Sequence, residues 1–419
     1  AEPNNPEQRA AWLAAKHADT PAILHQDSLA RPILAIADNG VDGQYLTLTE
    51  LDIEGKPLRI IDDRGNAVMD YSLQNINADG TINFIPGYDI TGQQLYQNSM
   101  DGGERWTLND VAGKLIRSWD SRGHAFHFLF DELRRPTHLF VRQGDNDELL
   151  SERLVYGESL PVDEAINLNL RGQVYRVYDD AGVVTNDSFD FKGNLLQGQR
   201  RFTQEYRARA NWTVIADPDD ITLIDNAAET LLEQSAPYVS TTEYDALNRP
   251  IRLITPDYSE ILPGYNEANL LERVDAHLRG EEDLSTFVGN IDYDAKGQRE
   301  KIEYGNGVAT QYEYDPNVFR LIRLSTVRVA DNVLLQDLSY SYDPAGNITE
   351  IRDDAQQTIF YDNDIVEPGS RFVYDALYRL IEARGREHIG QNGTLQGSHD
   401  DSPRMNHPLP GDAQAMRRY

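Results

Sequence analysis

Large apolar side chains occupy every second position along many short segments of this chain. The segments 126–130, 310–314 and 338–342 are clear examples, and in the last two the intervening positions are polar. Side chains in an extended strand point alternately to the two faces of a sheet, so a period of two predicts strands with one buried face. Short turn-forming stretches separate these segments. The pattern therefore predicts many antiparallel strands joined by tight turns.

A five-residue motif recurs at the ends of the alternating segments. It consists of an aromatic residue, Asp, two free positions, and then Gly or Asn. The clearest copies start at Tyr88, Tyr178, Phe189, Tyr244, Tyr293 and Tyr342, and looser copies start at Leu51, Ile61, Asn109, Trp119, Phe130, Tyr265, Tyr314 and Tyr374. Repetition this frequent indicates a repeat architecture.

Each position of the motif has a role in a hairpin turn. Asp is favoured at the first turn position, where its carboxylate accepts a hydrogen bond from a backbone N–H two residues on. Gly or Asn then supplies the positive φ of the bulge that closes the loop. We therefore predict tight turns at Asp245–Asn248, Asp294–Gly297 and Asp343–Gly346, with Gly297 and Gly346 at positive φ.

The spacing of the motifs predicts how the hairpins follow one another. Motif starts lie 10 or 11 residues apart, as from Tyr178 to Phe189, or 21 apart, as from Tyr293 to Tyr314. Twenty-one residues equal two strand-plus-turn units, and a different turn, 305–307 in this case, lies midway. The spacing predicts a regular up-and-down antiparallel meander.

Several segments interrupt the repeats. Asn5 as N-cap and Pro6 at the first helical position predict a short helix that continues to about His17. A helix is also expected from Ile224 to Gln234, and Asp163–Ala165 and Ala276–Phe287 are read as smaller interruptions. These insertions are interpreted as covers for sheet edges or openings.

The motif and its interruptions divide the chain into five parts. They are an N-terminal helix and lead-in (1–39), a first repeat sheet (40–201), a partly helical insertion (202–240), a second repeat sheet (241–390) and an irregular C-terminal tail (391–419).

Composition narrows the classes of partner. The net charge of −30 disfavours nucleic acid and anionic membrane surfaces. The absence of cysteine excludes disulfides and thiolate metal sites. No segment has the length of a transmembrane helix, and the first residues lack a basic region followed by an apolar stretch. We expect the chain to be a piece of a longer polypeptide, with no membrane insertion by this segment.

The sequence offers no convincing catalytic or metal-binding group. Sixty-nine carboxylates make chance pairs common, and most conspicuous Asp residues are accounted for as turn residues. His124 and His127 lie on opposite faces of a predicted strand, and the acidic segments 144–148 and 362–364 lack the spacing of a calcium loop. No Gly-x-Ser-x-Gly elbow or phosphate-binding loop is present. We predict no catalytic, cofactor-binding or metal-binding residues and no cofactor.

The motif copies resemble those of the YD-repeat, or Rhs, family. The run from Tyr244 through Gly385, and residues 169–173 leading into Tyr178-Asp179 and the copy at Phe189, are similar to the repeat portion of the B and C components of Tc insecticidal toxin complexes. The resemblance covers roughly residues 40–390 and implies a β-ribbon that spirals into a hollow shell around a toxic polypeptide. The family's self-cleavage motif, integrin-like propeller and amino-terminal module are not found.

These observations predict an all-β protein, an extended antiparallel β-hairpin ribbon that curves into part of a hollow shell, with short helical insertions. The resemblance implies a non-enzymatic shell segment of a secreted toxin complex. Its partners would be further YD-repeat segments, in the same or a partner chain, and an encapsulated toxin. A negative wall would suit a basic client, although the pattern assigns the charges to neither face. The alternatives are a cell-surface adhesion or carbohydrate-binding protein and, less favoured, a glycan-active enzyme.

Overall fold

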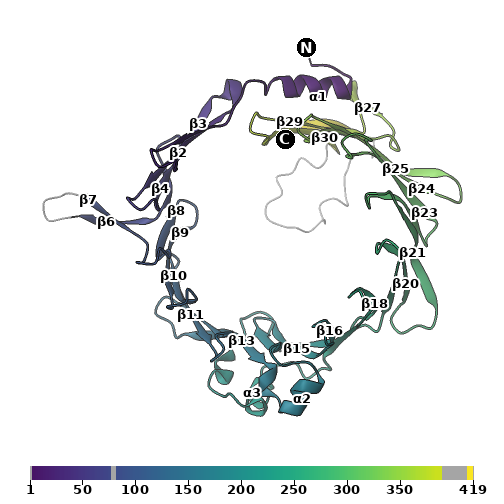
Figure 1. Cartoon of the computed structure of the whole chain (residues 1–419). Coiled ribbons are helices and arrows are strands. Elements are labelled where there is room, and N and C mark those ends of the chain that lie inside the picture. The colour runs from purple at the N-terminus through teal and green to yellow at the C-terminus, as the bar shows by residue number, and fades with distance from the viewer. Residues whose placement is uncertain (1, 77–81, 389–412, 419) are drawn as a thin grey trace.

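The chain folds into one long antiparallel sheet that is bent into a ring (Figure 1). The computed structural model describes residues 2–76, 82–388 and 413–418, and within them 27 strands belong to this sheet. Strands adjacent in sequence pair with one another almost throughout, from β1 with β2 to β30 with β31. The predicted all-β hairpin ribbon with an up-and-down order is confirmed.

The strands follow one another along the ring. The first part of the sheet contains β1 (Ile23–Gln26), β2 (Pro32–Asp38), β3 (Gln44–Leu51), β4 (Pro57–Ile61), β5 (Ala67–Asp70), β8 (Tyr96–Ser99), β9 (Gly103–Asn109), β10 (Leu115–Asp120), β11 (His124–Phe130), β12 (Pro136–Gln143), β13 (Leu149–Tyr156), β14 (Val174–Asp179), β15 (Gly182–Phe189) and β16 (Leu195–Phe202). The second part contains β17 (Tyr238–Tyr244), β18 (Pro250–Ile254), β19 (Glu260–Tyr265), β20 (Leu271–His277), β21 (Leu284–Tyr293), β22 (Arg299–Tyr304), β23 (Val308–Tyr314), β24 (Leu321–Arg328), β25 (Val333–Tyr342), β26 (Ile348–Asp353), β29 (Gly369–Tyr374), β30 (Leu380–His388) and β31 (Gln414–Arg418).

Among the described residues, two hairpins and three α-helices lie outside the sheet. The hairpins are β6 (Ser72–Ile76) with β7 (Ile82–Pro86) and β27 (Ile359–Tyr361) with β28 (Asp364–Val366). The helices are α1 (Pro6–Ala15), α2 (Val162–Asn167) and α3 (Ile221–Ala228). The β6–β7 hairpin projects outward from the ring, and the sequence pattern did not predict this projection (Figure 1).

The three predicted turns form as expected. The carboxylate of Asp245 accepts a hydrogen bond from the backbone N–H of Leu247 at 2.8 Å, and that of Asp294 accepts one from Lys296 at 2.8 Å. The closing residues have positive φ, +64° at Asn248, +79° at Gly297 and +110° at Gly346. Turn chemistry read from the local sequence was therefore sufficient to locate these hairpins.

The motif spacing corresponds to the two rims of the ring. In a meander, successive turns lie on opposite edges of the sheet, so motifs 10 or 11 residues apart alternate between rims and motifs 21 apart share one rim. The turns at 245–248, 294–297 and 343–346 follow β17, β21 and β25 and lie on the same rim. We call this rim, which also carries the turns 52–55, 110–113, 131–134, 190–193, 266–269, 315–319 and 375–378, the motif rim.

The helical predictions hold in part. α1 has the predicted cap, with Asn5 Oδ1 accepting a hydrogen bond from the Gln8 N–H at 3.0 Å. The helix expected at Ile224–Gln234 instead starts at Ile221 and ends at Ala228, because Asp220 supplies the N-cap. Residues 276–287 are not an interruption, since they form the β20–β21 hairpin of the sheet.

Both ends of the sheet extend beyond the two predicted repeat sheets, 40–201 and 241–390. β1 and β2 lie within the N-terminal lead-in, and β31 lies within the tail that was expected to be irregular. β31 pairs with β30 from Arg384↔Arg418 to His388↔Gln414. Strand formation depends on packing against the neighbouring strand more than on the strand's own sequence. A short end strand such as β31 can therefore form without a clear alternation of apolar and polar residues.

A compact hydrophobic cluster forms where the insertion covers the sheet. Trp212 and Ile224 of the insertion are fully buried and pack with Tyr178 and Val183 of the sheet. Trp212 and Tyr178 meet edge to face at 5.2 Å, and the indole N–H donates to the Asp179 carbonyl at 2.8 Å. Figure 1 places α2 and α3 on the outer side of the ring. The insertion therefore covers the outward face of β14–β16.

Candidate functional site

The wall is reinforced along the motif rim by tyrosine hydroxyls. Tyr293 Oη donates to the Leu271 carbonyl at 2.5 Å, and Tyr342 Oη donates to the Leu321 carbonyl at 2.7 Å. In each case the acceptor is the first residue of the strand that follows the preceding motif-rim turn. Seven tyrosines of the described residues make this contact, namely Tyr88, Tyr156, Tyr265, Tyr293, Tyr314, Tyr342 and Tyr374. At these seven places a tyrosine ties one hairpin to the one before it.

A basic residue strengthens the same junction. Arg249 follows one motif turn and its guanidinium lies 4.5 Å from the ring centre of Tyr265, the aromatic of the next motif. Arg135 over Tyr156, at 3.9 Å, repeats this arrangement. The sequence interpretation missed these contacts. Their signal is a Lys or Arg five residues after the motif start, as at Arg249 and Arg135.

The two faces of the second half of the ribbon differ in chemistry. Two residues paired across neighbouring strands have their side chains on the same face of the sheet. The outward face can therefore be traced from strand to strand, starting at the residues that α3 covers. Val183 on that face pairs with Arg201, and the outward face continues to Glu243, which pairs with Arg252. Arg252 contacts Glu243 at 2.8 Å and Glu260 at 2.5 Å. Further outward ion pairs are Arg273–Asp275, Lys301–Glu303 and Arg323–Asp337.

The inward face of the same strands is apolar and aromatic. Thr242 pairs with Leu253, Leu253 with Ile261, and Val274 with Val288, which in turn pairs with Tyr304. Charged groups of this half therefore gather outside, where water solvates them, and tyrosine and aliphatic side chains face the centre.

The two ends of the ribbon meet at a seam that contains no backbone ladder. In the described residues, β1 pairs only with β2 and β31 only with β30. Helix α1 bridges the gap on the outside of β29 and β30 (Figure 1). Its Arg9 is 3% exposed and donates from Nη1 to the Thr349 carbonyl at 2.9 Å and to the Phe372 carbonyl at 3.4 Å. Arg9 also pairs with Glu2.

The Thr349 carbonyl can accept this bond because of a bulge. The β25–β26 register shifts between Ser341 and Tyr342, which leaves Thr349 without a residue opposite it. Bulges also occur at the motifs that start at Phe189, Tyr244 and Tyr293, and here the unpaired group receives the buried guanidinium. A repeat feature thus creates the binding site for α1.

Beyond α1, the N-terminal segment contacts the motif rim at the turn 375–378. Asn39 Oδ1 accepts a hydrogen bond from the Ala376 N–H at 3.0 Å, and its Nδ2 donates to Asp375 at 3.4 Å. Arg379 lies 5.3 Å from the ring centre of Tyr45. This contact reproduces that of Arg249 with Tyr265, so residues 39–45 take the place of the next repeat after the turn at 375–378.

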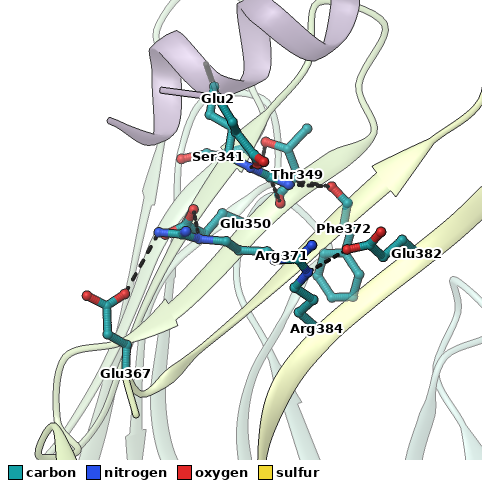
Figure 2. Close-up of polar contacts among 10 residues, drawn as sticks. Glu2, Ser341, Thr349, Glu350, Glu367, Arg371, Phe372, Glu382 and Arg384 are labelled. Carbon is teal, nitrogen blue, oxygen red and sulfur yellow. Dashed lines mark hydrogen bonds and ion pairs between the residues drawn. The ribbon is translucent and has the colours of Figure 1, made fainter. Parts of the chain in front are cut away.

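An ionic cluster lies on the outward face beside the seam. Arg371 pairs with Glu350 at 3.0 Å, and Arg384 pairs with Glu382 at 2.5 Å, beneath the start of the chain at Glu2 (Figure 2). A cleft of about 700 Å³ separates this cluster from α1. Acidic and basic side chains alternate along the lining of this cleft. The cleft therefore favours neither an anionic nor a cationic ligand.

The residues considered for chemistry do not converge on a site. His124 Nδ1 lies 3.0 Å from Asp120, and His127 Nδ1 lies 3.5 Å from Glu148, on the other face of β11. Among the described residues, no group of three or more His, Asp or Glu has a metal-binding arrangement. No helix in this part of the chain has the length and apolarity needed to cross a membrane. The absence of catalytic and cofactor residues remains a prediction.

The fold and these contacts define a repeat-built shell wall: one hairpin ladder, tied together along one rim and bent into a ring. No protein-family model matches the chain. Its sequence is 29% identical over 398 residues to "Toxin subunit YenC2" of Yersinia entomophaga, covering 90% of the chain and 39% of that subunit. It is 30% identical to "Toxin subunit YenC1" of the same organism, covering 71% of the chain and 30% of that subunit.

Solved structures agree with the sequence comparison. The TcdB2–TccC3 crystal structure superimposes with a TM-score of 0.79 at 27% identity, covering 98% of the chain and 19% of that structure. The Photorhabdus luminescens Tc holotoxin pore superimposes with a TM-score of 0.78, covering 96% and 18%. The chain resembles the YD-repeat shell of Tc toxins in sequence and in structure, as its motifs indicated. It spans well under half the length of these relatives.

Proposed function

We propose that this chain forms part of the wall of a hollow shell that encloses a toxic polypeptide and aids its delivery. The main support for this proposal is the ring of hairpins (Figure 1). Backbone ladders hold its strands together, and α1 holds its two ends together. Further YD-repeat segments, in the same or a partner chain, would extend the wall on either rim. The complex would be secreted, and the chain would have a structural rather than an enzymatic role.

The adhesion or carbohydrate-binding alternative receives less support. A carbohydrate platform requires aromatic rings and hydroxyls that are open to a ligand. Here seven tyrosines on the motif rim, six of them in motif copies, use their hydroxyls to bond the wall itself. The motif residues are therefore engaged in building the ring.

Protease protection tests the proposal. The full polypeptide that contains this segment is assembled with its partner subunits and treated with trypsin. We expect an internal polypeptide to resist digestion until denaturant opens the shell, and electron microscopy to show density inside. Digestion of that polypeptide at the rate measured for it alone would exclude the container function.

A further inference from the structure

A hollow in the inward face of the wall lies over β15, β16 and β17. Its volume is about 450 Å³, and its lining includes Val184, Gly198, Phe202 and Tyr238. The face assignment follows from register. Arg201 bonds Glu229 at the end of α3, at 2.7 Å, whereas its neighbour Phe202 points to the opposite side of the same strand. Because α3 lies outside the ring, the hollow opens toward the centre (Figure 1).

Glycine at position 198 forms part of the floor of the hollow. Gly198 pairs with Asn186 on one side and with Ser240 on the other, so small or polar side chains surround a position that has none. The backbone at Gly198 does not have positive φ, and an added Cβ would meet its nearest atoms at 3.3 Å. The φ angle therefore does not demand glycine, but a side chain at position 198 would press on Leu195 and on the Thr185 carbonyl.

Two large aromatic side chains form one wall of the hollow and are partly exposed. Phe202 is 41% exposed and Tyr238 is 45% exposed, and their rings meet edge to face at 5.2 Å. Among the described residues, no hydrogen bond is found for the Tyr238 hydroxyl, unlike those of the motif tyrosines. An uncovered aromatic pair favours contact with another apolar group.

The hollow carries no net charge to select an ionic ligand. Arg200 is its one charged lining residue, and its guanidinium makes two hydrogen bonds to the Asp179 carboxylate, at 2.6 and 3.0 Å. The apolar inward face of β18–β22 continues from the hollow through Leu253, Ile261 and Val274. A neutral, apolar occupant therefore matches the site, and an extended chain could follow the strip that leads from it.

We infer that the hollow binds large aromatic or aliphatic side chains of an extended polypeptide inside the ring. This inference rests on the proposed container function and adds the chemistry by which the wall contacts the enclosed polypeptide. The wall would hold its client by apolar side chains, whereas a negative wall was expected to attract a basic one. Burial of each such side chain would remove apolar surface of client and wall from water together.

Fluorescence anisotropy with two peptides tests the inference on the chain itself. Both are labelled 12-residue peptides of equal charge, one containing Phe and Leu and the other Ser and Gln at the same positions. We expect the apolar peptide to bind at least tenfold more tightly. Gly198→Leu, which fills the hollow, should weaken its binding at least fivefold. Gly264→Leu is the matched control, because Gly264 pairs with Arg273 on the outward face and should leave binding unchanged.

A second variant protects the test against misfolding. Circular dichroism and thermal unfolding check that each variant keeps the wild-type fold. If Gly198→Leu unfolds, Phe202→Ala with Tyr238→Ala replaces it, and the same fivefold loss is expected. Equal binding of the two peptides, or equal loss in Gly264→Leu, would overturn the inference. Protease protection of an enclosed polypeptide would still hold in that case, so failure of the hollow is distinguishable from failure of the container function.

Discussion

The wall and the seam hold the ring together by different means. Neighbouring strands in the wall share a backbone ladder, such as the eight-residue β24 against the ten-residue β25. The seam instead relies on side chains of α1 and of residues 17–45, which reach carbonyls and turns near the other end of the ribbon. A backbone ladder keeps its hydrogen bonds when one side chain changes, whereas the seam concentrates its contacts in a few side chains. The ring should therefore open at the seam first.

The difference also shows how repeat proteins close. Terminal repeats lack a neighbour on one side and need a cap or a partner. In this chain the cap is the N-terminal segment, which copies the contact that Arg249 makes with Tyr265 by placing Tyr45 beneath Arg379. Closure thus reuses a repeat interaction between residues far apart in the sequence.

Of the changes considered, loss of Arg9 should have the largest effect on closure of the ring at the seam. Arg9→Met keeps the apolar stem but removes the charged hydrogen bonds to the Thr349 and Phe372 carbonyls, at a cost of about 1.5–3 kcal/mol. Electron microscopy should show open rings, and limited proteolysis should release residues 2–22. Arg273→Met is the control, since its exposed ion pair with Asp275 lies in the ladder-held wall. Rings that stay closed in Arg9→Met would contradict the importance of the seam.

Motif turns should be the next most sensitive positions. Valine at Gly297 or Gly346 must adopt a φ of +79° or +110°, which costs about 1–3 kcal/mol. We expect denaturant melts to shift accordingly while electron microscopy still shows closed rings. Gly264→Val, which does not require positive φ, is the matched control. Unchanged melts in both turn variants would show that backbone strain at these turns does not govern wall stability.

Removal of one tyrosine hydroxyl should have a smaller effect. Tyr293→Phe deletes the bond to the Leu271 carbonyl and should cost about 0.5–1.5 kcal/mol. Tyr258→Phe serves for comparison, because Tyr258 is 75% exposed and lies on the other rim. Equal melting temperatures for the two variants would argue that the hydroxyl row adds nothing to the wall.

A single turn carboxylate should contribute least, through the pH dependence of stability. The Arg249 side chain and backbone hold the pKa of Asp245 below its ordinary value, against the opposing effect of burial. A lowered pKa in the folded state gives stability that is complete at neutral pH. This stability is lost as pH falls through the ordinary carboxyl range, about 4 and below. Asp245→Asn should flatten the fall in melting temperature between pH 5 and pH 3 slightly, as pH-dependent melts can measure. A curve parallel to wild type would contradict this.

Much of the wall was predictable because its determinants are local. The Asp245 and Asp294 turns depend on hydrogen bonds that span two to four residues, and alternation requires only neighbouring positions. Helix α3 was placed imperfectly because its start depends on Asp220, a cap outside the apolar pattern that suggested the helix. The β6–β7 projection and strand β31 were missed because their sequences lack the motif.

The local sequence specifies a hairpin ribbon with aromatic-Asp turns, since each turn contains its own signals within five residues. Long-range contacts specify that the ribbon closes, where it closes and which face looks inward. Arg9 reaches acceptors 340 and 363 residues away, and those acceptors are backbone carbonyls that every residue possesses. Such contacts have no residue-type signature. The direction of curvature likewise depends on the summed twist of many strands and on the helices that cover one face.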